Sequence, residues 1–376
     1  MANNISPYDH IWYANRAIQR LEKALKFTKT VFRAYDSEPR KQGQTIDIRK
    51  PGGFTAAAMP ITTAADIDPS TVSVTLDQWY GVAFKIGDKE EAYTGERIVT
   101  ESIDPAMQAL AQKIEDDMLS MYKSVPWYFT GANPAVLNDL IQLRKTLNDN
   151  NVPQEGRVLQ MTSEREADLL AITNFLNANE GSNPATQREG SLGRKFGFDL
   201  FDNQSMPTHT AGTLAGTAGI LTNGISAVHA TTINVDDATA LSGTIKAGDI
   251  LEIAGVAQKY ACTADTTAAA NAAAIPVHPQ VQVAIPDGAA VTVVTNSKSQ
   301  SLAYHPEAFA LAMAPLSMRG NGKGAQIATV RDPRTNLALR TTMWYEPKDA
   351  ESWVRFDALW GKVVLDPNRA VRWFGV

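Results

Sequence analysis

The chain has few of the residue patterns that mark catalysis, export or disulfide stabilisation. It has 376 residues and one cysteine, Cys262, which excludes an internal disulfide framework and any zinc site built from several cysteines. No apolar run reaches about 18 residues, and the first ten residues do not have the pattern of a signal peptide, so we expect neither a membrane span nor export. We therefore expect a protein that stays in the cytoplasm, or in the particle into which it assembles.

Charge and hydropathy place the chain among globular proteins. Apolar residues make up 44% and charged residues 20%, which is too apolar for a disordered chain. The 35 basic and 40 acidic side chains give a net charge of −5, whereas a dedicated nucleic-acid binder is usually basic.

Residues that could carry chemistry are present but scattered. No two histidines are three or four residues apart, which excludes a helical zinc motif, and we expect no metal site. The histidines are His10, His209, His229, His278 and His305. His305 precedes Pro306 at an expected helix start, where a structural role is favoured. Cys262 lies in an Ala- and Thr-rich segment, and we expect it to be a small buried apolar residue.

Two further motifs of enzymes are absent or incomplete in the sequence. No Gly-x-Ser-x-Gly elbow occurs. The stretch from Gly320 to Gly324 (GNGKG) has the glycines of a phosphate loop but not its Gly-Lys-Ser/Thr ending, so it is interpreted as a surface loop. The sequence therefore predicts no catalytic residue, no cofactor site and no metal site.

A change in composition defines one internal segment. Residues 211–297 hold 8 charged side chains in 87 positions, against 67 in the other 289, and they contain no Trp and no Phe. Short β-branched runs separated by Gly, Asp and Pro predict a small inserted β-barrel or sandwich. The strands we expect are Thr232–Val235, Ile250–Ile253, Val281–Ile285 and Val291–Thr295.

The flanking sequence predicts a mixture of helices and strands. We expect a helix from Asp104 to about Ser124, with Asp104 as N-cap and Pro105 at the first helical position. Further helices are predicted from Asn133-Pro134, from Ser163 with a capping box to Glu166, and after His305-Pro306 through Met313.

Strand patterns occupy two other regions. Residues Gly43 to Tyr93 predict a long projecting hairpin with strands at Thr45–Ile48 and Ser73–Leu76. Residues Leu337 to Trp373 alternate again and hold four of the seven tryptophans, so we expect core strands there.

Charge is distributed unevenly near the N-terminus. The first 50 residues have ten basic and five acidic side chains, and residues 51–100 have three basic and seven acidic ones. Four of the basic residues have helical spacing: Lys23, Lys26, Lys29 and Arg33. A solvated helix face is the default interpretation, and an arm that docks on an acidic neighbour is the alternative.

Five stretches, in order along nearly the whole chain, resemble the major capsid (coat) proteins of tailed double-stranded DNA phages, and in particular the short-tailed Salmonella-phage type with an inserted domain. They are Gly43–Pro51, Arg188–Leu200 with Asn203–Pro207, Ala247–Val256, Ala303–Ala312 and Arg355–Gly361. The resemblance implies an α+β fold of the Hong Kong ninety-seven capsid type with an inserted barrel-like domain. The implied division is an N-arm (1–42), an extended loop (43–95), a spine helix with part of the peripheral domain (96–130), part of the axial domain (131–210), the inserted domain (211–297), and the axial return with peripheral strands (298–376).

The same resemblance implies a shell protein. Its implied partners are copies of itself in hexamers and pentamers, a scaffolding protein, a portal protein at one vertex, packaged DNA in non-specific contact, and in some cases decoration proteins. The implied location is the virion, after assembly in the cytoplasm of a bacterial host.

Two other interpretations stay open at this point. An encapsulin-type compartment has the same fold and holds protein cargo instead of DNA. A surface adhesin or carbohydrate-binding module could use residues 211–297, but the expected absence of an export signal argues against it.

Overall fold

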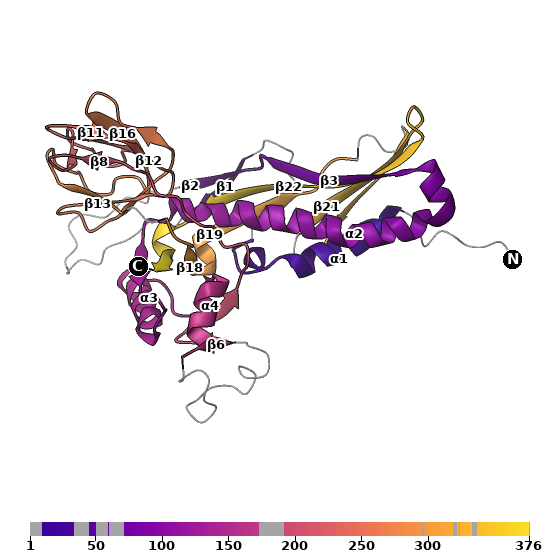
Figure 1. Cartoon of the computed structure of the whole chain (residues 1–376), viewed down its shortest axis with the longest axis horizontal. Coiled ribbons are helices and arrows are strands. Elements are labelled where there is room, and N and C mark those ends of the chain that lie inside the picture. The colour runs from indigo at the N-terminus through magenta and orange to yellow at the C-terminus, as the bar shows by residue number, and fades with distance from the viewer. Residues whose placement is uncertain are drawn as a thin grey trace. The chain divides into compact units, whose positions relative to one another are not determined.

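The computed structural model describes residues 10–33, 45–49, 59, 71–172, 192–294, 297–318, 322, 324–332 and 337–375. Its helices and strands are labelled in Figure 1, and the chain divides into two units. Unit 1 comprises Met1–Ile114 and Phe309–Leu365, and unit 2 comprises Glu115–Ala308 and Asp366–Val376. Each unit combines helices with strands, so the predicted α+β class is confirmed.

Unit 1 is built on a five-stranded antiparallel sheet. Its strands are β3 (Gln78–Gly87), β19 (Phe309–Ala314), β20 (Ala325–Arg331), β21 (Ala338–Glu346) and β22 (Glu351–Val364). The long strand β22 pairs with β3, β19 and β21. Its buried residues include Phe356 and Trp360, which confirms the prediction of core strands near the C-terminus.

A buried ion pair ties three strands of this sheet together. The guanidinium of Arg340 on β21 donates two hydrogen bonds to the carboxylate of Asp357 on β22, at 3.0 and 2.5 Å. The indole of Trp79 on β3 donates to the same carboxylate at 3.1 Å. A bidentate pair of this kind fixes orientation as well as contributing energy.

The predicted helix after His305-Pro306 is wrong. Only a short 3₁₀ turn, η5 (Pro306–Ala308), follows His305, and the next six residues form strand β19. All six β19 residues are buried, and they pair with β22 from Phe309 to Ala314. Pairing of this strand, which is buried along its whole length, outweighs the helical spacing of the apolar side chains.

The long helix α2 (Asp88–Leu119) begins sixteen residues before its predicted start, and Pro105 lies inside it. A proline there removes one backbone hydrogen bond, but Ile103 and Met107 on either side are buried. The helix therefore continues past Pro105, because the packing of these neighbours outweighs the lost hydrogen bond. The 3₁₀ turn η3 (Ser120–Ser124) follows it.

The predicted hairpin is confirmed in its strands but not in its extent. Strand β1 (Thr45–Arg49) pairs with β2 (Thr71–Thr75). Residues of β3 belong to the main sheet, and Tyr93 lies in α2, so the hairpin does not reach Tyr93. The residues between β1 and β2 fall outside the described part of the chain, apart from Met59.

Helix α1 (His10–Ala24) occupies the expected arm, but the interpretation of Lys23, Lys26, Lys29 and Arg33 as one solvated helix face is wrong. The helix ends before Lys26 and Lys29, which are exposed, because Leu25 and Phe27 turn inward at the 3₁₀ turn η2 (Phe27–Lys29). The side chain of Lys23 lies outside the described part of the chain.

Unit 2 contains a second sheet, which with its two helices we call the α/β part. Its strands are β4 (Tyr128–Gly131), β5 (Val158–Met161), β6 (Arg194–Lys195), β7 (Phe198–Asp202), β18 (Ser301–Tyr304) and β23 (Ala370–Gly375), with a 3₁₀ turn η6 (Pro367–Arg369) before β23. Leu140, Leu143, Phe198 and Trp373 belong to its core.

Both helices of the α/β part begin near, but not at, the predicted residues. Helix α3 (Leu137–Asp149) begins after Val136, whose N–H donates to the Asp139 carboxylate at 3.2 Å, and not at Asn133-Pro134. Helix α4 (Ser163–Leu170) is capped by Thr162, whose hydroxyl accepts from the Arg165 N–H at 3.4 Å. The predicted cap Ser163 is therefore wrong by one residue.

Residues 211–297 form an inserted β domain with its own core, which includes Ile233, Leu251, Tyr260 and Ile275. One sheet has the order β17-β13-β14-β16-β10-β9, and two small ladders pair β8 with β11 and β12 with β15. The strands are β8 (Ala215–Gly216), β9 (Leu221–Thr222), β10 (Thr232–Asp236), β11 (Leu241–Ser242), β12 (Thr244–Ile245), β13 (Ile250–Ile253), β14 (Tyr260–Cys262), β15 (Thr266–Thr267), β16 (Ala272–His278) and β17 (Val291–Val294).

The inserted sheet is nearly closed. A bridge joins Leu221 to Ala290, and the N–H of Val291 donates to the carbonyl of Ile220 at 2.8 Å, so the two edge strands β9 and β17 meet. The barrel-like prediction is confirmed. The predicted strand Val281–Ile285 is wrong, because that segment forms only an isolated bridge from Ile285 to Ser226.

Candidate functional site

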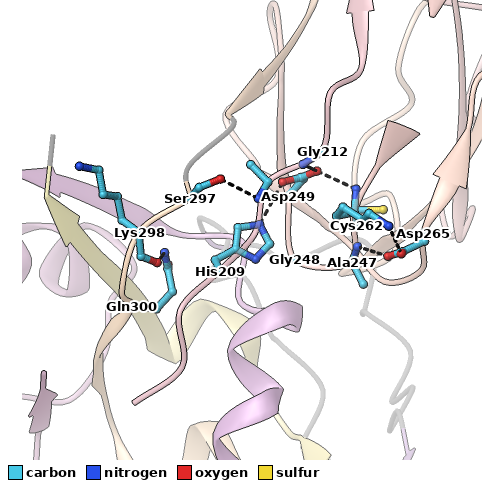
Figure 2. Close-up of polar contacts among 12 residues, drawn as sticks. His209, Gly212, Ala247, Gly248, Asp249, Cys262, Asp265, Ser297, Lys298 and Gln300 are labelled. Carbon is cyan, nitrogen blue, oxygen red and sulfur yellow. Dashed lines mark hydrogen bonds and ion pairs between the residues drawn. The ribbon is translucent and has the colours of Figure 1, made fainter. Parts of the chain in front are cut away.

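The inserted domain joins the α/β part through two chain connections that run side by side. The N–H of His209 donates to the carbonyl of Lys298 at 3.0 Å, and the N–H of Gln300 donates to the carbonyl of Pro207 at 2.9 Å. The N–H of Ala211 adds a hydrogen bond to a serine hydroxyl of the returning connection at 3.1 Å. We call this paired region and the side chains that lock it the junction (Figure 2).

His209 is the central side chain of the junction and is only 4% exposed. Its Nε2 lies 3.0 Å from Asp249 Oδ1, and its Nδ1 lies 3.1 Å from the Tyr122 hydroxyl. Since a carboxylate accepts, Nε2 of the ring donates to Asp249, and in the tautomer protonated only at Nε2 the Nδ1 atom accepts from the Tyr122 hydroxyl. Burial raises the pKa of Tyr122, which keeps that hydroxyl protonated as a donor.

Asp249 is fully buried and accepts on both oxygens. Besides the histidine on Oδ1, its Oδ2 accepts from the backbone N–H groups of Gly212 at 3.0 Å and Lys246 at 2.7 Å. One carboxylate thus connects the entering chain, the turn before β13 and the imidazole. A buried charge is tolerated where several donors satisfy it in this way.

The turn that presents Asp249 requires glycine. Gly248 has a φ of +105°, and a Cβ there would lie 2.9 Å from His209 Cε1. Its carbonyl accepts from Arg372 Nη1 at 2.6 Å, and Arg372 Nε donates to the carbonyl of Val125 at 2.8 Å. Burial lowers the pKa of Arg372 to about 10, so the guanidinium stays charged at neutral pH and holds the turn against β23.

A second group of contacts holds the inserted domain further along β13. The Tyr128 hydroxyl on β4 donates to Glu252 Oε1 at 2.9 Å, and Lys259 Nζ lies 2.6 Å from the same oxygen. Burial, then the hydrogen bond to Glu252, raises the pKa of Tyr128. Burial opposes ionisation of Glu252, but the hydrogen bonds from Lys259 and Tyr128 outweigh it and lower the pKa of that carboxyl.

None of these contacts positions a nucleophile. Cys262 is buried, its Sγ donates to the carbonyl of Ala264 at 3.0 Å, and burial raises the pKa of its thiol to about 11. At neutral pH it is a thiol and not the reactive thiolate. The prediction of a small buried apolar residue is confirmed.

Of the four histidines whose side chains the structure describes, one, His209, lies in the junction cluster. His278 lies outside this cluster, and its Nδ1 donates to the carbonyl of Ser124 at 3.0 Å. His305 Nδ1 accepts from the N–H of Glu307 at 3.4 Å at the start of η5, a structural contact. His229 is exposed, with a φ of +68°. Within the described ranges no three His, Cys, Asp or Glu side chains gather as a metal site would require.

The sequence did not single out the residues that matter most here. Asp249 lies in the quoted stretch Ala247–Val256, and its Gly-Asp pair before an apolar run is the one signal that marks a structured turn. No local sequence pattern links Tyr122 or Arg372 to His209, because they lie 87 residues before it and 163 residues after it. The GNGKG loop lies mostly outside the described part of the chain.

Comparison with known proteins identifies the fold but no close relative. No protein-family model matches the sequence, and no curated protein matches it either. Among the helices that the structure describes, none is long and apolar enough to cross a membrane.

Two solved structures share the fold over almost the whole chain. A chain titled "Mycobacterium phage Che8" matches with a TM-score of 0.53 and 15% identity, covering 93% of this chain and 90% of that one. A chain from the capsid structure of the cyanophage P-SCSP1u matches with a TM-score of 0.50 and 11% identity, covering 94% and 88%. The fold of this chain is therefore the fold of a phage capsid chain, as the sequence predicted.

Proposed function

We propose that the chain is the major capsid protein of a tailed double-stranded DNA phage, a structural tile that assembles into an icosahedral head shell. The single observation that carries this proposal is the shared fold with a chain of a phage capsid structure over 94% of this chain. The five ordered sequence stretches support it independently.

The two units fit the parts of such a tile. We assign the helix α2 to the spine, the β1–β2 hairpin to the extended loop, and the arm to the segment that contains α1. The sheet of unit 1 would be the peripheral domain, and the α/β part of unit 2 the axial domain. An arm and a hairpin give a thin tile contact area on neighbouring copies that a compact domain lacks.

The partners follow from the same proposal. Copies of the chain would form hexamers and pentamers, a scaffolding protein would guide them, a portal protein would occupy one vertex, and the inner wall would meet DNA without sequence preference. The net charge of −5 suits a shell that should not bind the packaged DNA tightly. The shell would form in the bacterial cytoplasm and persist in the virion, with a structural and not an enzymatic role.

Electron microscopy of the purified chain, beside size-exclusion chromatography, tests the proposal. We expect closed shells, tubes or large curved sheets, from the chain alone or after co-expression with the scaffolding protein of its phage. A chain that stays monomeric with scaffolding protein present would refute it. Shells that enclose a defined protein cargo, identified by mass spectrometry, would support the encapsulin interpretation instead.

We further propose that the inserted domain mainly stabilises the subunit and its contacts within a capsomer. The paired connections permit a clean test, because the chain can be rejoined where His209 and Lys298 are hydrogen-bonded to each other. Deletion of residues 211–297 with a short glycine linker should impair folding and assembly. Unchanged folding and unchanged shells in the deletion variant would contradict this role.

A further inference from the structure

A polar cavity lies beside the junction in unit 2. Its volume is about 220 Å³, and it lies between the N-terminal end of α4, the end of β23 and both connections of the inserted domain. Three charged side chains line it, Glu164, Arg165 and Lys298. Because all its walls belong to one unit, it is a built feature of that unit.

Arg165 gives the cavity a buried cation with an unused edge. The residue is 5% exposed, its Nη1 donates to the carbonyl of Ala132 at 2.7 Å, and that atom lies 3.4 Å from Asp168 Oδ2. The guanidinium packs over the Trp373 ring at 5.4 Å. Its Nη2 has no hydrogen-bond partner within the described ranges, and a Cβ on Gly375 would fall on that atom.

The lack of a side chain at Gly375 therefore keeps one edge of the guanidinium clear where it faces the cavity. A guanidinium edge offers paired N–H donors whose spacing matches the oxygens of a carboxylate or phosphate. An oxyanion bound at that edge would accept from Nη2, for which the described residues provide no hydrogen-bond acceptor.

The other walls suit the same kind of ligand. Lys298 is exposed and has no carboxylate partner within the described part of the chain. The hydroxyls of Thr208 and Ser299 lie 3.4 Å apart on the two connections, and both residues line the cavity. The first turn of α4 adds the positive end of its dipole. Glu164 is the one carboxylate among the lining residues. Asp168 pairs with Arg165 at 3.4 Å, and Lys298 is the lining cation for which the described residues supply no carboxylate partner.

We propose that this cavity binds one small oxyanion, of the phosphate or carboxylate class, between Arg165 and Lys298. The volume exceeds the roughly 30 Å³ share of one water several-fold, which leaves room for a tetrahedral anion with bridging waters. A bound oxyanion would connect α4 to both strands of the junction and so hold the inserted domain more firmly. The site does not depend on the proposed capsid function.

Equilibrium dialysis of the full chain with labelled inorganic phosphate, at constant pH and with ionic strength matched by sodium chloride, tests the proposal. We expect saturable binding of one phosphate per chain, with acetate as a competitor. Lys298→Met should weaken it about tenfold, the loss expected for one charge-assisted contact. Arg165→Gln should abolish it.

A matched control separates the site from general charge effects. Lys145 is an exposed lysine on α3 that pairs with Asp149 at 3.2 Å and does not line the cavity. Lys145→Met removes the same charge and should leave phosphate binding unchanged. If Arg165→Gln fails to fold, phosphate binding by Lys298→Met still tests the proposal. Absence of saturable binding by the unaltered chain, or equal binding by Lys298→Met and Lys145→Met, would overturn the proposal.

Discussion

Replacing Asp249 by alanine removes a carboxylate that accepts three hydrogen bonds within the junction. The carboxylate is fully buried and accepts from His209 Nε2 and from the N–H groups of Gly212 and Lys246 at 2.7 to 3.0 Å. Alanine would leave without an acceptor one buried donor, His209 Nε2, and the backbone N–H groups of two half-buried residues, at about 1–3 kcal/mol for each donor that water does not reach. We expect the junction to be destabilised by about 4 kcal/mol or more.

Hydrogen exchange at the amides of Gly212 and Lys246 is the assay, because a global melting curve would mix the transitions of two units. A loss of about 4 kcal/mol corresponds to protection on the order of 1,000-fold lower. The matched control is Asp265→Ala, at a residue that contacts the same turn from the segment between β14 and β15. Asp265 accepts from the Ala247 N–H and from Lys246 Nζ, but its side chain is 55% exposed, so water replaces the lost contacts and the cost should be below about 1 kcal/mol.

The double variant His209→Ala with Asp249→Ala adds a test of the pair itself. If the two side chains interact as the 3.0 Å contact indicates, their combined cost should fall short of the sum by about 1.5 kcal/mol. Equal exchange in Asp249→Ala and Asp265→Ala, or strict additivity in the double variant, would refute the proposed role of this carboxylate.

Other predictions concern single residues elsewhere. Gly248→Ala should cost about 2 kcal/mol in chemical unfolding, because alanine is strained at φ +105° and its methyl would meet His209. Pro105→Ala should stabilise the chain by about 1 kcal/mol or more, because it restores a backbone hydrogen bond inside α2, and a lower melting temperature would contradict this. Cys262 should resist iodoacetamide at pH 8 until the chain is unfolded, given its thiol pKa of about 11. Backbone hydrogen bonds, first that from the N–H of Thr239, lower the pKa of the Asp237 carboxyl. The stability that this carboxylate contributes is therefore complete above its ordinary pKa of 3.8 and is lost as the pH falls below that value. The difference in melting temperature between the unaltered chain and Asp237→Asn should narrow between pH 5 and pH 3.

The junction is assembled from residues that lie far apart in the sequence. Its cluster draws Tyr122 from η3, His209 from one connection, Asp249 from the turn before β13, and Arg372 from β23. An inserted domain that folds around its own core needs such contacts, because two chain connections alone would let it rotate relative to the α/β part. We therefore expect substitutions in this cluster to disturb the inserted domain before they disturb the α/β core.

Local patterns were sufficient wherever the nearby sequence controls the structure. The low-charge, β-branched composition of residues 211–297 predicted a separate β domain, and strands β10 and β13 begin at the predicted residues, Thr232 and Ile250. The alternating C-terminal region likewise became β21, β22 and β23. In each case the period of two in the apolar residues is itself the signal.

Local patterns failed where distant contacts outweigh propensity. The helix-like spacing after Pro306 became strand β19 because β22 pairs with it, and Pro105 did not start α2 because buried neighbours carry the helix past it. The sequence by itself thus determined the α+β class and the inserted domain. Only the tertiary structure decided the junction and the polar cavity, because their side chains come from segments up to about 250 residues apart, and a distance between such segments is set by packing and not by any local pattern.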